Sequence, residues 1–266
     1  NWYKMTAAHN TVVVDAKNQL TRFGVPETEP LQVQLDPRKG SVLGTTTAWV
    51  AGEVVKLIRA EGPALVQTTA LQKFERSLLL IDISPEDSYL LEIIRVTGGH
   101  DHAKFMHGNF GTVSATGIPS TPMVDFGPET QMRNFRGGTP APGWQVDWKI
   151  ADRYRYLPAG AEVHLRYTDL TNETQAALAE SWLIERGHET WVPSLLVRRQ
   201  GATTEQLVST FVAILEPYTD RTKIKTISRI NLETETGQTA DEANVGVIVQ
   251  QASGRSDLLI AAATGP

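Results

Sequence analysis

Residues 77–96 read SLLLIDI-SPED-SYLLEIIRV, and this stretch decides how the chain folds. The runs 77–83 and 88–96 are rich in Leu and Ile, whereas residues 84–87 combine a proline with acidic side chains. Two apolar, β-prone runs separated by a short turn of this composition are typical of a β-hairpin. We therefore predict two neighbouring antiparallel strands joined by a turn at 84–87.

Short apolar runs of the same kind recur along most of the chain, with turn residues between them. We predict an all-β protein, an antiparallel β-sandwich of stacked sheets with about a dozen strands and little helix. Residues 176–186 also suit a helix by propensity, and only their context favours a strand. The other expected strands are a valine run ending at 15, a run starting at 145, and 41–50, 53–59, 64–69, 162–167, 178–185, 191–199, 207–215, 223–230, 245–251 and 257–262.

Bulk composition narrows the classes of function. The net charge of −5 argues against general nucleic-acid binding, although a local basic patch can still hold an anionic sugar. No apolar run approaches the roughly 18 residues that span a bilayer, so we expect no membrane-embedded segment. The chain has no cysteine, which excludes disulfides, thiolate metal sites and a cysteine nucleophile. The compartment stays open.

A histidine cluster directly follows the predicted hairpin. Gly98 and Gly99 precede His100, Asp101 and His102, and His107 comes five residues later. We expect residues 98–108 to form a loop at the rim of a sheet, because paired glycines let the backbone leave the sheet. The imidazoles could bind zinc or another divalent ion, transfer protons near neutral pH, contact a carboxylate, or simply cap backbone groups.

Residues 108–145 have a different composition from the rest of the chain. Seven glycines and five prolines fall in this segment and no periodicity is visible, so we predict a long irregular loop. It carries Arg133 and Arg136 on either side of Asn134-Phe135. Two guanidinium groups on a flexible backbone could clamp a sugar carboxylate, because arginine can meet a carboxylate with two parallel hydrogen bonds. The simpler interpretation is a pair of solvated loop charges.

Several segments, in the same order along the chain, resemble the heparinase II/III-like polysaccharide lyases. One is HNTVVVD at residues 9–15, followed by Gln19. Others are RSLLLID at 76–82, and DSYLLEIIRV at 87–96, continuing through His100-Asp101 and His107-Gly108. DRY at 152–154 and STFVAILEPY at 209–218 also look like the family's C-terminal sheet domain. No single motif is decisive, but the ordered set covers most of the chain.

The resemblance implies a fold, an activity and a metal. In that family an (α/α) toroid precedes a β-sandwich, and uronate-containing polysaccharides of the alginate or heparin type are cleaved by β-elimination. Residues 1–266 would be the β-sandwich region, the C-terminal part of a larger enzyme. The resemblance makes His9 a ligand of a structural zinc, and it places the other zinc ligands and the catalytic residues upstream. The expected partners are an acidic polysaccharide or oligosaccharide and the toroid segment or chain.

The chemistry of elimination suggests how the work would be divided. The reaction needs a base for the C5 proton, a group that neutralises the uronate carboxylate and an acid for the departing oxygen. With the base and the acid on the toroid, we expect one wall of the sugar site to come from His100, His102, His107, Arg133 and Arg136. Two alternatives remain: a non-catalytic carbohydrate-binding or structural β module, and a metal-dependent hydrolase that uses the histidine cluster.

Overall fold

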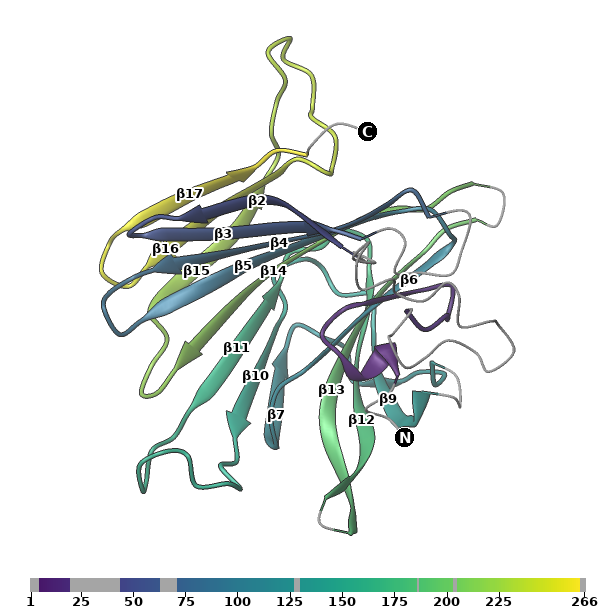
Figure 1. The fold of residues 1–266 in the computed structure, drawn as a ribbon, viewed down its shortest axis with the longest axis vertical. Helices are drawn as coiled ribbons and strands as arrows, with labels where there is room; N and C mark the ends of the chain where they lie inside the picture. The colour runs from purple at the N-terminus through teal and green to yellow at the C-terminus, as the bar shows by residue number, and fades with distance from the viewer. Residues whose placement is uncertain are drawn as a thin grey trace, which may run out of the picture.

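A computed structural model describes residues 5–19, 44–62, 71–126, 130–185, 187–202 and 205–263. These residues form 17 strands in three antiparallel sheets and one 3-10 turn, η2 (Thr6–Ala8), which confirms the predicted all-β class (Figure 1). No helix among them is long and apolar enough to cross a bilayer. The predicted strand at 64–69 and the first residues of the one at 41–50 lie outside the described ranges.

The sheets contain six, eight and three strands. In spatial order the six-stranded sheet holds β1 (Val12–Val14), β6 (Asp101–His107), β13 (His188–Gln200), β12 (Gln175–Glu185), β9 (Met132–Gly138) and β8 (Thr121–Pro122). The eight-stranded sheet holds β2 (Thr45–Ala51), β3 (Val55–Glu61), β4 (Lys73–Asp82), β5 (Ser88–Thr97), β14 (Val208–Tyr218), β11 (His164–Asp169), β10 (Gln145–Ile150) and β7 (Gly111–Thr116). The three-stranded sheet holds β15 (Ile224–Ile230), β16 (Val245–Gln251) and β17 (Ser256–Ala261).

The predicted hairpin is present as β4 and β5. Asp82 lies opposite Ser88 at its closed end. The Ser84 hydroxyl oxygen accepts hydrogen bonds from the backbone N–H groups of Glu86 (3.2 Å) and Asp87 (3.0 Å), which fixes the turn. Residues 176–185, for which a helix was the alternative, are paired on both sides as β12 and are a strand.

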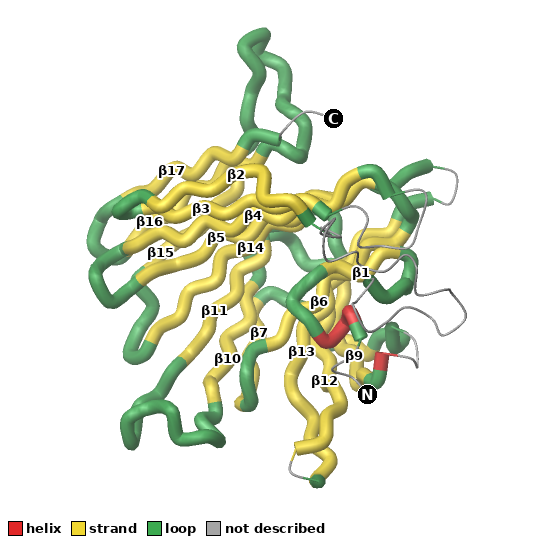
Figure 2. Tube along the Cα trace, in the orientation of Figure 1, coloured by secondary structure: helices red, strands yellow, loops and turns green. Residues whose placement is uncertain are grey.

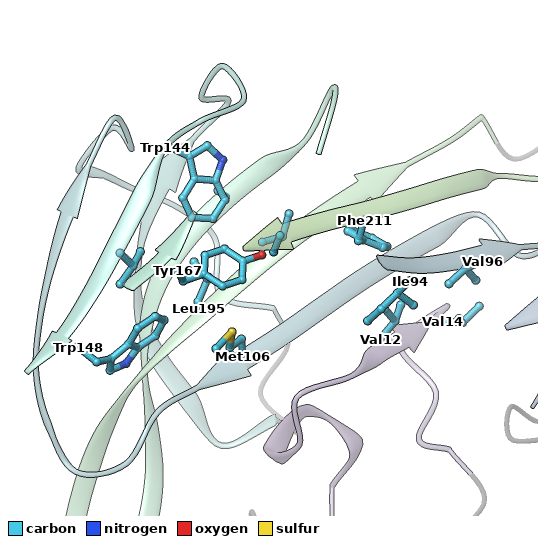
Figure 3. Packing of buried hydrophobic residues seen from close by; sticks show 14 of the residues in the cluster. Val12, Val14, Ile94, Val96, Met106, Trp144, Trp148, Tyr167, Leu195 and Phe211 are labelled. Carbon is cyan, nitrogen blue, oxygen red and sulfur yellow. The ribbon is translucent and has the colours of Figure 1, made fainter. Parts of the chain in front are cut away.

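β5 is buried on both faces, and this makes the eight-stranded sheet the middle layer. Ile94 and Val96 pack toward the six-stranded sheet in a cluster with Val12 and Val14 (Figure 3). The alternate residues, such as Ile93, pack toward the three-stranded sheet. Because successive side chains of a strand point to opposite faces, a strand covered on both sides reads as a continuous apolar run. This explains why most residues at 88–96 are apolar, on both faces of the strand.

The prediction of a rim loop over residues 98–108 was wrong for most of that segment. Only residues 98–100 connect the sheets, and Asp101–His107 is strand β6 of the neighbouring sheet. Gly98 and Gly99 adopt φ values of 110° and 77°, which favour glycine. A Cβ on Gly99 would lie 2.8 Å from atoms of both Val14 and Asp15. The paired glycines therefore carry the chain across to the next layer, where it resumes as a strand.

The prediction of a long irregular loop at 108–145 was also wrong. This segment contains β7, β8 and β9, with residues 127–129 outside the described ranges. Its glycines serve close packing as well as turns. A Cβ on Gly137, inside β9, would lie 1.9 Å from the carbonyl oxygen of Ala176 in the paired strand β12. Glycine content alone could not separate such a strand from a loop.

Charged side chains are buried between the six- and eight-stranded sheets. The Lys104 ammonium lies 2.6 Å from the Glu92 carboxylate, and the two residues are 1% and 3% exposed. Arg76 pairs with the same carboxylate, and Lys104 donates to the Tyr167 hydroxyl at 3.2 Å. Burial by itself raises the pKa of Glu92, but the two cations outweigh it and the net pKa is lowered. Glu92 is therefore ionised, and its contact with Lys104 ties the two layers together.

Removing one partner should expose the cost of this buried charge. We expect Lys104→Met to lower the free energy of unfolding by about 3–5 kcal/mol, because Glu92 stays buried without its buried cation and keeps only the partly exposed Arg76. The measurement is urea denaturation followed by tryptophan fluorescence. Lys149→Met removes a lysine from an exposed pair with Glu162 and should leave the midpoint unchanged. If the two variants lower the urea midpoint equally, the buried pair contributes no more to stability than the exposed one.

Candidate functional site

The segment HNTVVVD at residues 9–15, one of those that resemble the lyases, holds both ends of β6. The Asn10 side chain accepts the backbone N–H of His107 at 2.9 Å and donates to the carbonyl of the same residue at 3.3 Å. At the other end of β1, one Asp15 carboxylate oxygen accepts the N–H groups of His100 (2.8 Å) and Asp101 (3.1 Å). Between them, β1 pairs along β6. The motif thus has a clear structural role, which is to fasten the strand that carries the histidine cluster.

His102 lies inside the molecule. It is fully buried, its Nε2 lies 2.7 Å from the carbonyl of Gly98, and its Nδ1 lies 2.8 Å from the Ser209 hydroxyl. The carbonyl can only accept, so Nε2 carries the proton and Nδ1 accepts from the serine. Burial is the largest influence on the ring and lowers its pKa. His102 is therefore a neutral brace between the connector and β14.

His100 is the histidine of the cluster with a ring atom available to a ligand. Its Nδ1 lies 3.0 Å from the carbonyl of Glu205, so Nδ1 donates and the ring is held in one orientation. In the neutral form Nε2 is then the acceptor. The residue is partly exposed at the connector between β5 and β6. This geometry suits a hydrogen bond to a sugar hydroxyl or a proton transfer.

His107 lies at the far end of β6, beside His9. Its Nδ1 lies 2.8 Å from the carbonyl of Gly108 and its Nε2 lies 3.1 Å from the carbonyl of Ala8. Donation to both oxygens at once requires the doubly protonated ring. Because Ala8 ends η2, this contact fixes the N-terminal segment on the sheet, and the next residue, His9, is exposed.

The described residues do not contain a complete metal site. No group of three or more His, Asp or Glu side chains in these ranges is arranged to hold an ion. Asp101, which the sequence places between two histidines, is held by two hydrogen bonds from Arg198 at 2.8 and 2.5 Å. His9, the expected zinc ligand, is exposed at the surface.

Arg133 and Arg136 both line one open groove of about 1030 Å³. Residues three apart in a regular strand point to opposite faces, but β9 contains a bulge. Asn134 there has a φ of 58°, and the pairing with β12 shifts between Leu178 and Glu180. The extra residue brings both arginines to the same face. The sequence identified Arg133 and Arg136 as a pair of positive charges. Only the bulge in β9 reveals that both side chains lie on the same face of the sheet.

The predicted wall is divided between two ends of the six-stranded sheet. His102 lies opposite Arg199 of β13, whereas His107 lies opposite Ser194. Ser194 is next to Pro193, which pairs with Glu180, and Glu180 pairs with Arg133. Five residues of strand separate the two levels, or about 16 Å. His107, Arg133 and Arg136 therefore lie toward one end, and His100 and His102 toward the other.

The groove also contains residues that the sequence did not single out. The Arg133 guanidinium lies 3.5 Å from the centre of the Trp191 ring and donates to Glu180 at 2.9 Å. Asn134 donates to the same carboxylate oxygen at 2.8 Å. Trp191 lies in a strand that begins with His188-Glu189-Thr190 and continues into apolar core, and no local motif marks it as a site residue. Only the pairing of β13, β12 and β9 brings these groups together.

Comparison with solved structures finds the same fold in heparan sulfate lyases. Heparan sulfate lyase HepC from Pedobacter heparinus superposes with a TM-score of 0.55 and 17% identity, over 98% of this chain and 31% of that one. A heparinase III gene product gives 0.59 and 14% identity over the same shares. The chain has the fold of a heparinase III β-sandwich region. It spans about a third of the length of these enzymes. No protein-family model matches the sequence, and no curated protein matches it either.

Within this heparinase III-like fold, buried His102 makes a pH-dependent contribution to stability. Its folded pKa lies below the unfolded value of about 6.5, so this contribution is complete above that pH and is lost as the pH falls through the folded pKa. We expect the urea midpoint to drop between pH 7.5 and 5.5, and to drop less in His102→Gln.

The matched control is His188→Gln, which changes a histidine in an exposed hairpin and should keep the wild-type slope. If His102→Gln loses as much stability on acidification as the wild type, the buried ring is not the source of the dependence.

Proposed function

We propose that this chain is the β-sheet part of a polysaccharide lyase that cleaves uronate-containing acidic glycans by β-elimination. The observation that carries the proposal is the match of nearly the whole chain to part of heparan sulfate lyase HepC and of heparinase III. The ordered motifs at 9–15, 76–96 and 209–218 support it independently, because they resemble lyases of the same kind.

The division of labour follows from what this chain offers. Elimination needs a base, an acid and a cationic or hydrogen-bonding group at the uronate carboxylate. The described residues provide hydrogen-bonding and positive groups at surface positions, namely His100 at one end of the six-stranded sheet and Arg136 at the other. The toroid would supply the base and the acid. Loops at the sheet ends then cover the sugar and exclude water.

The first test is direct detection of elimination. The chain alone, and the chain joined to the toroid segment that the proposal requires, are incubated with alginate and with heparan sulfate. Formation of the 4,5-unsaturated uronate chromophore by the joined protein only would support the proposed role. A joined protein that binds glycan without producing the chromophore would favour the alternative of a carbohydrate-binding module. Activity of the chain alone that a chelator abolishes would favour a metal-dependent enzyme.

His100 is the histidine that we expect to affect turnover. His100→Ala should lower the turnover of the complete enzyme by about tenfold or more, since positioning or proton-transfer help would be lost. Its stability should change by less than about 1 kcal/mol, because the side chain lies at the surface. His102→Ala should do the reverse, since it leaves buried polar partners unsatisfied. Full activity of His100→Ala together with a large loss of stability would show that His100 only holds the connector.

A structural zinc bound partly by His9 is the second component of the proposal. Zinc takes imidazole nitrogens in tetrahedral sites, and when bound here it would fasten the N-terminal segment to the upstream part. We expect His9→Ala to lower the zinc content of the complete protein, measured by inductively coupled plasma mass spectrometry, and to lower its melting temperature. His188→Ala, at an exposed hairpin, is the control. Unchanged metal content would remove His9 from the ligand set.

A further inference from the structure

The groove that Arg133 and Arg136 line lies where the two larger sheets diverge. The residues on one side come from β7, the last strand of the eight-stranded sheet, and those on the other side from β9, β12 and β13. These strands are labelled in Figure 2. A segment from 118 to 125 lies along the same opening. At about 1030 Å³ the groove has the volume of a ligand site and room for more than one sugar ring.

Arg136 is the arginine in this groove that forms no direct ion pair with any described carboxylate, whereas Arg133 pairs with Glu180. The Nε of Arg136 lies 3.2 Å from the Ser120 hydroxyl oxygen, and its Nη2 donates to the Ser120 carbonyl at 2.6 Å. Within the described ranges no carboxylate lies at ion-pair distance from it. The other arginines in the strands of the two larger sheets are all paired with carboxylates: Arg59, Arg76, Arg95, Arg133, Arg166, Arg198 and Arg199.

The hydrogen bonds to Ser120 orient the guanidinium and leave one edge open. A guanidinium has five N–H donors, and two of them are used here. The remaining three are both hydrogens of Nη1 and one of Nη2. These form the edge that meets a carboxylate with two parallel hydrogen bonds. Since Arg136 is exposed, this edge is accessible from the groove.

Arg133 has a different role in the same groove. Its charge is balanced by Glu180, and its guanidinium lies over the Trp191 ring. Trp191 is fixed further by a hydrogen bond from its indole N–H to Glu189 at 2.8 Å. Arg133 therefore holds an aromatic surface in the groove, and an aromatic wall beside a few placed polar groups is typical of small-ligand sites.

The charges that line the groove favour a uronate over a densely sulfated ligand. Asp125 lines the groove as well, so the carboxylates of Asp125 and Glu180 offset the two arginines. A densely sulfated ligand would meet repulsion from Asp125. A uronate residue offers one carboxylate for Arg136 and hydroxyls that can donate to Asp125.

We propose that this groove binds a uronate residue of a glycan, with its carboxylate on the open edge of Arg136 and its ring against Trp191. The choice of a glycan rests on the proposed function. The site itself lies toward the opposite end of the sheet from His100, so it is a separate subsite that holds the chain of sugars away from that position.

The test measures binding to the 266-residue chain without turnover. The probe is an unsulfated mannuronate tetrasaccharide, titrated by calorimetry beside its carboxyl-reduced counterpart and a sulfated, carboxylate-free dextran tetrasaccharide. We expect the uronate probe to bind best. Arg136→Ala should weaken it by about tenfold or more, and Arg136→Lys should weaken it as well because the two-point contact is lost. Trp191→Ala should also weaken binding.

Arg221→Ala removes an exposed arginine outside the groove and should bind the probe as the wild type does. Thermal unfolding of each variant checks that Arg136→Ala is folded. The inference is overturned if the wild type does not bind the uronate probe, if the reduced or the sulfated probe binds equally well, or if Arg136→Ala binds normally. If the joined protein forms no chromophore in the lyase assay, the proposed function is overturned. Binding of the uronate probe through Arg136 would still stand as a separate result.

Discussion

Packing against both faces of β5 holds the three layers together. Ile94 and Val96 face the six-stranded sheet and Ile93 faces the three-stranded sheet. Along this strand, neither face of the middle sheet is exposed to solvent. Any charged residue on β5 must then find a partner inside the molecule. Glu92 meets Lys104 from the next sheet on one side, and Arg95 meets Glu75 on the other. The same constraint that builds the core therefore also fixes how the layers align.

The clamp between β1 and β6 follows from that arrangement. The chain leaves β5 through Gly98 and Gly99 and must start a strand in another sheet at once. Asp15 accepts the first two N–H groups of this new run, and Asn10 holds its last residue. The segment most like the lyases is therefore explained by backbone geometry before any catalytic role is considered. This supports a shared fold, and it leaves the chemistry to residues at the surface.

The residues proposed to contact a glycan lie at the two ends of the six-stranded sheet and in the groove beside it. His100 lies at one end, while His9, His107 and the groove with Arg136 lie toward the other. A long acidic glycan could contact both, whereas a small substrate could not. Under the proposed function, binding would be spread over this surface and the rest of the enzyme would supply the reacting groups; the chain itself spans about a third of the length of its structural neighbours.

The sequence alone determined the all-β class, the hairpin at 77–96 and most strand positions, because alternating and continuous apolar runs report directly on which faces are buried. It also located the histidines and arginines. It did not determine that 101–107 is a strand, that β9 lies within a glycine-rich segment, or that His102 points inward. Those depend on pairing between strands far apart in sequence: Gly137 is needed by the backbone of β12, His102 by Ser209, and the bulge at Asn134 turns Arg133 and Arg136 to one face. Such contacts leave no local pattern, so only the tertiary structure could decide them.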